Sequence, residues 1–373
     1  MKRSAFHTPE GYRDIYEESC EQKLSLEEDL KRALYSYGYQ TIELPSVEFA
    51  SLYTGSSSSM ADAELYRFFD RNGDMLSLRP DFTPSVARAA AKYFDPDKEP
   101  VRLCYLGQTF VNHFNYQGRL RECTQLGAEL IGDRSADADA EVIALVIEAL
   151  LKTGLTQFQL TLGHAGYFEG LVRETGLDEA QTEDLKTLIR NRNRFGVSAY
   201  LEEHHIHEEA AESLSRLIEL FGDSQILKKA QERACTKMAR EAAERLRQVY
   251  DILSLYKLEQ YVSFDLGMLG NYMYYTGIIF RGYTYGTGDA IVKGGRYDYL
   301  LSQYGKDAPS TGFVIMIDDL LNAMKRQKLP LKTMDPVTTL SYDKESRARV
   351  IREAQELRRK GMRVQLVATG EEI

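Results

Sequence analysis

Hydrophobic residues recur along the chain with helical and strand periods in turn, which predicts a mixed fold of helices and strands. Residues 18–37 carry apolar side chains at intervals of three and four and are followed by Gly38. They therefore predict an amphipathic helix with a glycine at its C-terminal end. Residues 136–154 are almost wholly apolar from Val142 to Leu151 and predict a helix that is buried on most sides.

The predicted strands are short and are bounded by turn residues. Residues 39–49 predict a strand that runs into Pro45, and residues 66–80 predict a hairpin that turns at Asn72 and Gly73. Apolar, β-branched and aromatic runs predict further strands at residues 101–111, 158–163, 261–269 and 271–286, and a strand that leads into a helix at residues 310–328.

Two changes of pattern suggest the domain organisation. Residues 178–257 lack proline, are densely charged and keep a helical period, so they predict a helical insertion. After Asp335 and Pro336 the chain has a β-α-β pattern of under 40 residues. We therefore expect an α+β core over residues 1–325, interrupted by the helical insertion, and a short α/β segment over residues 336–373.

Composition narrows the class of protein. The chain has 373 residues, of which 43% are hydrophobic and 28% charged, as is usual for a globular protein of about two domains. The net charge of −9, with no basic arm, disfavours binding to a nucleic acid. Phosphate-cradling glycine loops and a GxSxG elbow are both absent from the sequence.

The same composition indicates where the protein works. The N-terminal residues 1–14 lack the apolar region of an export signal, and no apolar run is long enough to span a bilayer. The four cysteines are scattered without metal-binding spacing, which favours reduced thiols in the cytoplasm.

Candidate chemistry is densest in residues 111–129. Gln125 and Glu129 stand beside Leu126 and Leu130, so we expect the two polar side chains to point into a pocket. A buried polar group without a partner costs about 1–3 kcal/mol, and a small ligand with an amine and a ring nitrogen would supply partners. Internal hydrogen bonds between protein groups are an equal alternative.

Asp81 and Thr83 form a second candidate site. They are predicted at the end of a strand just before a helix, and Pro84 suits the first position of that helix. An acid and a hydroxyl exposed there could bind an ammonium group, or Thr83 could instead cap the helix N-terminus.

Two further segments have a simple and a functional interpretation. Residues 55–64 are small and polar, which predicts a surface loop and leaves a lid as the alternative. His204 and His207, with Glu208, could ligate a metal ion, but the pattern favours the solvated start of a helix, and no metal site is predicted.

Several of these segments together resemble the histidine-binding blocks of class II histidyl-tRNA synthetases, and the resemblance runs from Thr8 to Leu321. The blocks are LRPDFT (residues 78–83), QGRLRECTQLGAE (117–129), YYTG (274–277) and GGRYD (294–298). The resemblance implies an antiparallel sheet flanked by helices, a homodimer and a pocket for free histidine. The site residues that it implies are Asp81 and Thr83 for the α-amino group, with Arg121, Gln125, Glu129, Tyr274, Tyr275 and Tyr297 around the rest.

The sequence departs from the synthetase pattern where ATP should bind. The three arginines that the synthetases place on ATP phosphates or at the reacting carboxylate correspond here to Val111, Gly270 and Asp319. Loss of one preorganised charge typically costs about 10²–10³ in rate. The three losses together predict that adenylation is absent and that the chain has no catalytic residues.

A histidine pocket without an ATP site resembles the ATP phosphoribosyltransferase regulatory subunits, the synthetase paralogues of histidine biosynthesis. That resemblance implies a subunit without a cofactor, which joins the short catalytic subunit in a hetero-octamer and makes it sensitive to histidine. The shortened C-terminal segment makes tRNA an improbable partner. Two alternatives stay open, namely a ligase that binds nucleotide through Arg119, Arg121 or Arg296, and a stand-alone histidine sensor.

Overall fold

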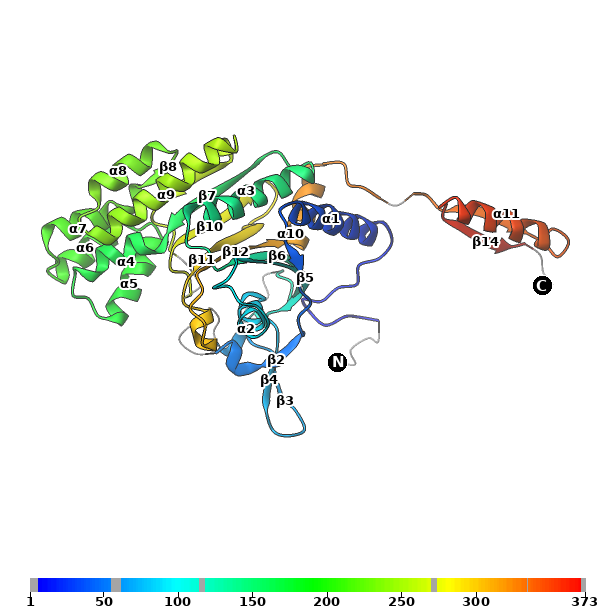
Figure 1. Cartoon of the computed structure of the whole chain (residues 1–373), viewed down its shortest axis with the longest axis horizontal. Helices are drawn as coiled ribbons and strands as arrows, with labels where there is room; N and C mark the ends of the chain where they lie inside the picture. The colour runs from blue at the N-terminus through cyan, green and yellow to red at the C-terminus, as the bar shows by residue number, and fades with distance from the viewer. Residues whose placement is uncertain (1–5, 55–61, 114–117, 270–273, 334, 370–373) are drawn as a thin grey trace. The chain divides into compact units, whose positions relative to one another are not determined.

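The chain, in a computed structural model, divides into two compact units (Figure 1). The first comprises Met1–Asp14 and Leu26–Pro330, and the second Ile15–Ser25 and Leu331–Ile373. The structure describes residues 6–54, 62–113, 118–269, 274–333 and 335–369. None of the described helices is long and apolar enough to cross a membrane.

A nine-stranded sheet is the centre of the first unit. Its strand order is β1-β5-β6-β12-β11-β10-β7-β9-β8. The strands are β1 (Gln40–Thr41), β5 (Val101–Phe110), β6 (Glu122–Ile131), β7 (Phe158–His164), β8 (Phe221–Gly222), β9 (Val262–Asp265), β10 (Ile278–Thr284), β11 (Val292–Tyr297) and β12 (Ser310–Met316).

The predicted α+β class is confirmed, but the sheet is mixed rather than wholly antiparallel. β1 pairs with β5 and β7 pairs with β9 in parallel, while the other pairs are antiparallel. Parallel neighbours need a long connection. The hairpin and α2 (Thr83–Tyr93) lie between β1 and β5, and the helical insertion lies between β7 and β9.

Helices cover both faces of this sheet (Figure 1). On one face α2 packs in a buried cluster with Phe82, Tyr105 and Tyr297. On the other face lie α3 (Ala136–Lys152), whose apolar run is buried on most sides as predicted, and α10 (Ile317–Arg326). The predicted first helix is α1 (Glu17–Ser36), and a short helix, α4 (Ala165–Arg173), follows β7.

A three-stranded sheet contains the predicted hairpin. Its order is β2-β4-β3, with β2 (Val47–Phe49), β3 (Arg67–Phe69) and β4 (Met75–Leu78). The turn is stabilised by Asp70 Oδ1, which accepts the backbone N–H groups of Asn72 and Asp74. The prediction of a single strand over residues 39–49 is wrong. The strand is interrupted between β1 and β2 around Pro45, which has no N–H to donate to a sheet.

The segment predicted as a helical insertion is mostly helical. Its helices are α5 (Glu179–Arg190), α6 (Arg194–Glu203), α7 (Glu208–Ser215), α8 (Gln225–Arg233) and α9 (Lys237–Leu255). It also contributes β8, which pairs with β9 at the edge of the central sheet. His204 stacks on Tyr200 at the end of α6, and in the described part of the chain no cluster of three or more metal-ligating side chains occurs.

The remaining elements are short or lie in the second unit. There β13 (Thr338–Tyr342), α11 (Arg347–Arg359) and β14 (Val364–Ala368) form the predicted β-α-β unit, with the two strands parallel. The short 3₁₀ helices are Ala50–Leu52, Asp62–Glu64, Leu217–Glu219, Glu259–Tyr261 and Leu301–Tyr304.

Candidate functional site

The carboxylate of Glu129 lies at the centre of a group of hydroxyls from three different elements. Thr83 Oγ1 and Tyr105 OH donate to its Oε1 at 2.8 and 3.3 Å, and Tyr297 OH donates to its Oε2 at 2.7 Å. The Glu129 side chain is only 1% exposed. These donors come from α2, β5 and β11, so the site forms only in the folded chain.

The environment of Glu129 disfavours its charge. Burial raises the pKa of the Glu129 carboxyl from 4.5 to about 8, although the Tyr297 and Thr83 hydroxyls counteract this and Asp81 adds to it. Burial also raises the pKa of the Asp81 carboxyl above its ordinary value. Two acids whose ionisation is costly are a suitable environment for a ligand cation, because a cation favours their charged forms.

Asp81 precedes α2 and has its own partners. Its Oδ1 accepts the Thr83 backbone N–H at 3.2 Å, and its Oδ2 accepts the Tyr274 hydroxyl at 3.1 Å. The alternative in which Thr83 caps α2 is wrong. Phe82 occupies the N-cap position without a side-chain cap, and the Thr83 hydroxyl donates to Glu129 instead.

Glycines let neighbouring strands approach this group. A Cβ at Gly312 on β12 would lie 1.6 Å from Glu129 Oε2, and a Cβ at Gly295 would lie 2.8 Å from the Tyr275 ring. The paired glycines 294–295 therefore permit a close approach of neighbouring groups, and Gly312 is a further requirement that the sequence did not reveal.

The eight predicted site residues line two adjoining spaces. A cavity of about 650 Å³ is lined by Asp81, Arg121, Gln125 and Tyr275, among others. A much smaller space of about 10 Å³ lies against Asp81, Thr83, Glu129, Tyr274, Tyr275 and Tyr297. The larger cavity has the size of a small-molecule site, whereas the smaller one has room for about one water.

Gln125 and Glu129 differ in how well their polar atoms are satisfied. Glu129 accepts three hydrogen bonds from other protein groups, so the alternative of internal hydrogen bonds holds for this residue. Gln125 Oε1 and Arg121 Nε are buried and lack a hydrogen-bond partner among the described residues. Both residues line the larger cavity, where a ligand could supply the missing partners.

Three positions replace the ATP-binding arginines, and the two that the structure describes lie at the same cavity. Val111 and Asp319 line it, and Gly270 lies outside the described residues, as do residues 55–61 of the proposed lid. Arg296 does not line this cavity, because its guanidinium is bound by Asp139 and Asp298. The suggestion that Arg296 binds nucleotide in this cavity is therefore wrong.

Sequence reasoning missed several residues of the site. Tyr105 is one, because its hydroxyl reaches Glu129 only through the pairing of β5 with β6. Arg79 is another: it donates to the carbonyls of Leu44, Pro45 and Gln108 and stacks on Phe82. Arg13, Arg281 and Lys293 also line the larger cavity, so it keeps cations that the motif comparison did not reveal.

Comparison with known proteins identifies the class to which this fold and site belong. A family model described as histidyl-tRNA synthetase matches residues 11–320. A histidyl-tRNA synthetase from Nostoc is 20% identical, with a TM-score of 0.79 over 100% of this chain and 88% of that one, and it shows the fold alone. The chain is a histidyl-tRNA synthetase-like protein with a class II fold.

Closer relatives define the particular family. The ATP phosphoribosyltransferase regulatory subunit of Acetivibrio thermocellus is 36% identical over 99% of this chain and 88% of its own length. The one from Caldanaerobacter subterraneus subsp. tengcongensis is 37% identical over 96% and 94%. A Bacillus halodurans crystal structure, described as an ATP phosphoribosyltransferase regulatory subunit/histidyl-tRNA synthetase, is 32% identical, with a TM-score of 0.88 over 98% and 94%. The chain belongs to the ATP phosphoribosyltransferase regulatory subunits.

Proposed function

We propose that this regulatory subunit binds free L-histidine beside Asp81 and Gln125 and transmits its presence to a catalytic ATP phosphoribosyltransferase subunit. The observation that carries the proposal is the buried Gln125 carbonyl, which has no hydrogen-bond partner in the described part of the chain, at a cavity next to two acids whose charged forms are disfavoured. An amino acid with a cationic amine and an imidazole N–H supplies a partner for each of these groups.

The roles of the site residues follow from their positions. Asp81 receives the α-ammonium at the boundary of the two spaces, which it lines on both sides. Gln125 accepts a ligand N–H, and Arg121 faces the ligand carboxylate from the same cavity. Behind this site the Glu129 carboxylate holds the hydroxyls of Thr83 and Tyr297. Entry of an imidazole into the 10 Å³ space requires the tyrosine side chains that line it to move.

We propose further that the chain has no ligase activity. Val111 brings no charge to the cavity, and Asp319 brings an acid where a triphosphate would lie. Burial and the neighbouring Asp289 and Asp318 raise the pKa of the Asp319 carboxyl, and whenever these acids are ionised they give this part of the wall a negative potential. Repulsion of this kind disfavours ATP despite the other cations of the cavity.

The assembly that we propose is a homodimer that joins the catalytic subunit in a cytoplasmic hetero-octamer. The small sheet supports the homodimer, because Val47, Phe49 and Phe68 are 38%, 59% and 41% exposed on one of its faces. Phe69 and Met75 are 67% and 44% exposed on its other face, and large apolar side chains gathered on one element are typical of protein interfaces. The described cysteines are free thiols, in keeping with a cytoplasmic location.

Calorimetric titration of the purified chain tests this function. We expect L-histidine to bind and ATP with Mg²⁺ to give no detectable heat, and we expect Glu129→Ala to abolish histidine binding while the oligomeric state persists. ATP binding that tightens with histidine would instead support a ligase. Co-purification with a catalytic phosphoribosyltransferase subunit distinguishes the regulatory subunit from a stand-alone sensor, which would not bind it.

A further inference from the structure

A second cavity, of about 690 Å³, lies between the central sheet and the helical insertion. Arg134 precedes α3 and His164 ends β7, while Gln231 comes from α8 and Arg240, Arg245 and Gln248 come from α9. None of these residues belongs to the candidate histidine site. The two cavities therefore have separate walls.

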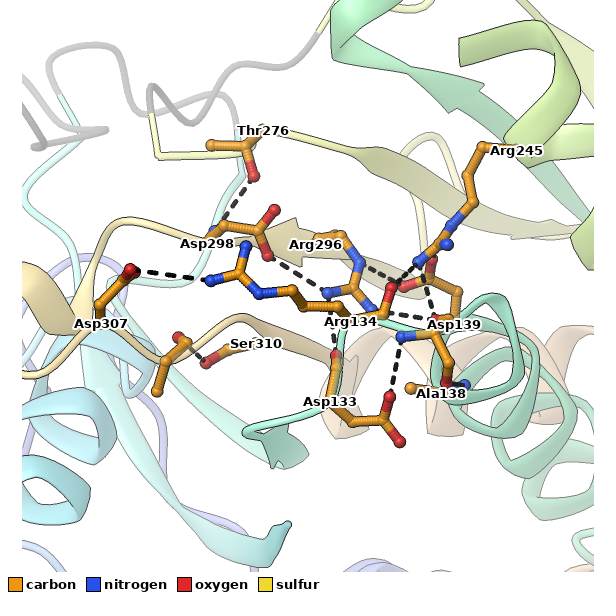
Figure 2. Close-up of polar contacts among 12 residues, drawn as sticks. Asp133, Arg134, Ala138, Asp139, Arg245, Thr276, Arg296, Asp298, Asp307 and Ser310 are labelled. Carbon is orange, nitrogen blue, oxygen red and sulfur yellow. Dashed lines mark hydrogen bonds and ion pairs between the residues drawn. The ribbon is translucent and has the colours of Figure 1, made fainter. Parts of the chain in front are cut away.

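Buried ion pairs form the floor of this cavity (Figure 2). Asp139 on α3 accepts the Nε–H groups of both Arg245 and Arg296, each at 2.9 Å. Asp298 accepts Arg296 Nη1 at 3.2 Å and is itself held by Thr276. Arg296 is 4% exposed and makes bonds with all three of its nitrogens, so it supports the floor rather than facing a ligand.

Arg245 keeps donor capacity toward the cavity. Its Nε is bound to Asp139, and its Nη2 donates to the backbone carbonyls of Arg134 and Ser135. Within the described ranges its Nη1 has no acceptor. Asp139 is shared by Arg245 and Arg296, and Arg296 is also paired with Asp298, so the charges of these four side chains balance and Arg245 offers the cavity a donor rather than a net charge.

His164 contributes a neutral donor. Its Nδ1 accepts the Gly166 backbone N–H at 3.1 Å, so the ring proton lies on Nε2. Burial, together with the nearby charges of Arg245 and Arg296, lowers the pKa of the His164 imidazole from 6.5 to about 3, so the ring stays neutral at physiological pH. Its Nε2–H is an additional donor at the cavity wall.

The acids around the cavity already have partners. Glu244 accepts Gln231 Nε2 at 2.5 Å, Glu241 lies 3.6 Å from the Lys237 ammonium, and Asp298 is bound to Arg296. Arg134 lies 3.7 Å from Asp307, an ion pair about as long as that of Glu241 and beyond a hydrogen bond. Arg240 donates only through Nη1 to the Ala234 carbonyl in the described structure. In the described structure Arg134 and Arg240 therefore keep N–H donors without a hydrogen-bond acceptor.

We infer that this cavity binds the phosphate group of a small polar metabolite, with Arg134, Arg240 and Arg245 around the phosphate. Guanidinium groups pair with phosphate oxygens through two parallel N–H donors, which suits this arrangement. The cavity is larger than a phosphate, and the amides of Gln231 and Gln248 suit hydroxyl groups. Among the described residues the His164 imidazole is the one aromatic ring at its wall, and no Phe or Tyr side chain lines it, so a sugar phosphate fits better than a nucleotide base, which would stack.

Calorimetry on the full chain at low ionic strength tests this inference, with inorganic phosphate and glucose 6-phosphate as probes and glucose as the neutral control. We expect both phosphorylated probes to bind and glucose not to bind. Arg134→Gln combined with Arg240→Gln should weaken glucose 6-phosphate at least tenfold. Both side chains are at the cavity rim and make few structural contacts, so the fold should persist.

Arg190→Gln is the control, because Arg190 lies on α5 outside this cavity and pairs with Glu183. It should leave the affinity unchanged. Absence of binding by both phosphorylated probes would overturn the inference, as would unchanged affinity in the double variant. Binding of a short single-stranded RNA without binding of glucose 6-phosphate would also contradict it and would indicate a polynucleotide.

Discussion

Gly312 on β12 stands directly opposite Glu129 on β6, so close that a Cβ at Gly312 would lie 1.6 Å from Glu129 Oε2. The Cβ would also lie 2.7 Å from the Ala128 carbonyl oxygen. The Glu129 carboxylate thus occupies space that only a glycine leaves open. Gly312 is in this sense part of the candidate histidine site, although it has no side chain to offer a ligand.

Gly312→Ala should destabilise the fold and displace the Glu129 carboxylate. Overpacking of a buried position typically costs about 1–3 kcal/mol, and we expect a loss of this size in urea unfolding. Histidine affinity should fall as well. Gly288→Ala is the control, because a Cβ there has no neighbour within 4 Å. Equal stability of the two variants would show that the strands separate without cost.

The free energy of unfolding should depend on pH through Glu129. Its pKa is about 8 in the folded chain and about 4.5 when unfolded, so the folded chain holds a proton that the unfolded chain loses between these values. The contribution of this proton to the free energy of unfolding is complete below pH 4.5. It is lost as pH rises toward 8, by at most about 1.4 kcal/mol per pH unit.

Glu129→Gln isolates this contribution, because its neutral amide has the same size and does not titrate. Urea unfolding at pH 5, 6, 7 and 8 should show a stability difference between variant and parent that grows in favour of the variant as pH rises. Parallel pH profiles for the two proteins would show that the Glu129 carboxylate is not strained by its burial.

Asp319→Arg should increase the affinity of the large cavity for ATP, because it removes an acid and adds a cation at its wall. We expect an increase of about tenfold or more, and a larger one when Val111→Arg is added. Asp184→Arg, on the exposed face of α5, gives the same change in net charge and should have no effect. Equal ATP affinity of the two single variants would contradict the proposal that Asp319 disfavours ATP.

Arg79→Lys should destabilise the connection around Pro45. Arg79 is 3% exposed, and its guanidinium reaches the carbonyls of Leu44, Pro45 and Gln108 at 2.8–3.2 Å. A lysine ammonium cannot cover all three, and each buried carbonyl left without a partner costs about 1–3 kcal/mol. Thermal unfolding measures the loss, with the exposed Arg71→Lys as a control that should not change the Tm.

Phe49→Ser combined with Phe68→Ser should weaken the homodimer. The two side chains lie on one face of the small sheet, since both residues pair with Leu76 on β4. Light scattering should show dimers of the parent and a shift to monomers in the variant at micromolar concentration. Phe195→Ser, at a residue 89% exposed on the helical insertion, should stay dimeric. A dimeric double variant would exclude this face as the interface.

The sequence predicted local features better than contacts between distant segments. The hairpin turn at Asn72 and Gly73 and the long helices were predictable, because they depend on neighbouring residues. The parallel pairs of the central sheet and the Tyr105–Glu129 contact were not, because they depend on how separate strands align. Motif comparison brought Asp81, Thr83 and Glu129 together, but it could not show that the space beside Glu129 is nearly filled.

Arg296 and Tyr297 are consecutive on β11, and strand geometry sends their side chains to opposite faces of the sheet. Arg296 is bound to Asp139 beneath the second cavity, and Tyr297 is bound to Glu129 behind the first. One rigid strand is therefore a mechanical link between the two proposed ligands. Thermodynamic reciprocity then requires that any factor by which histidine changes phosphate affinity equals the factor by which phosphate changes histidine affinity. A regulatory subunit built in this way would report two metabolites at once.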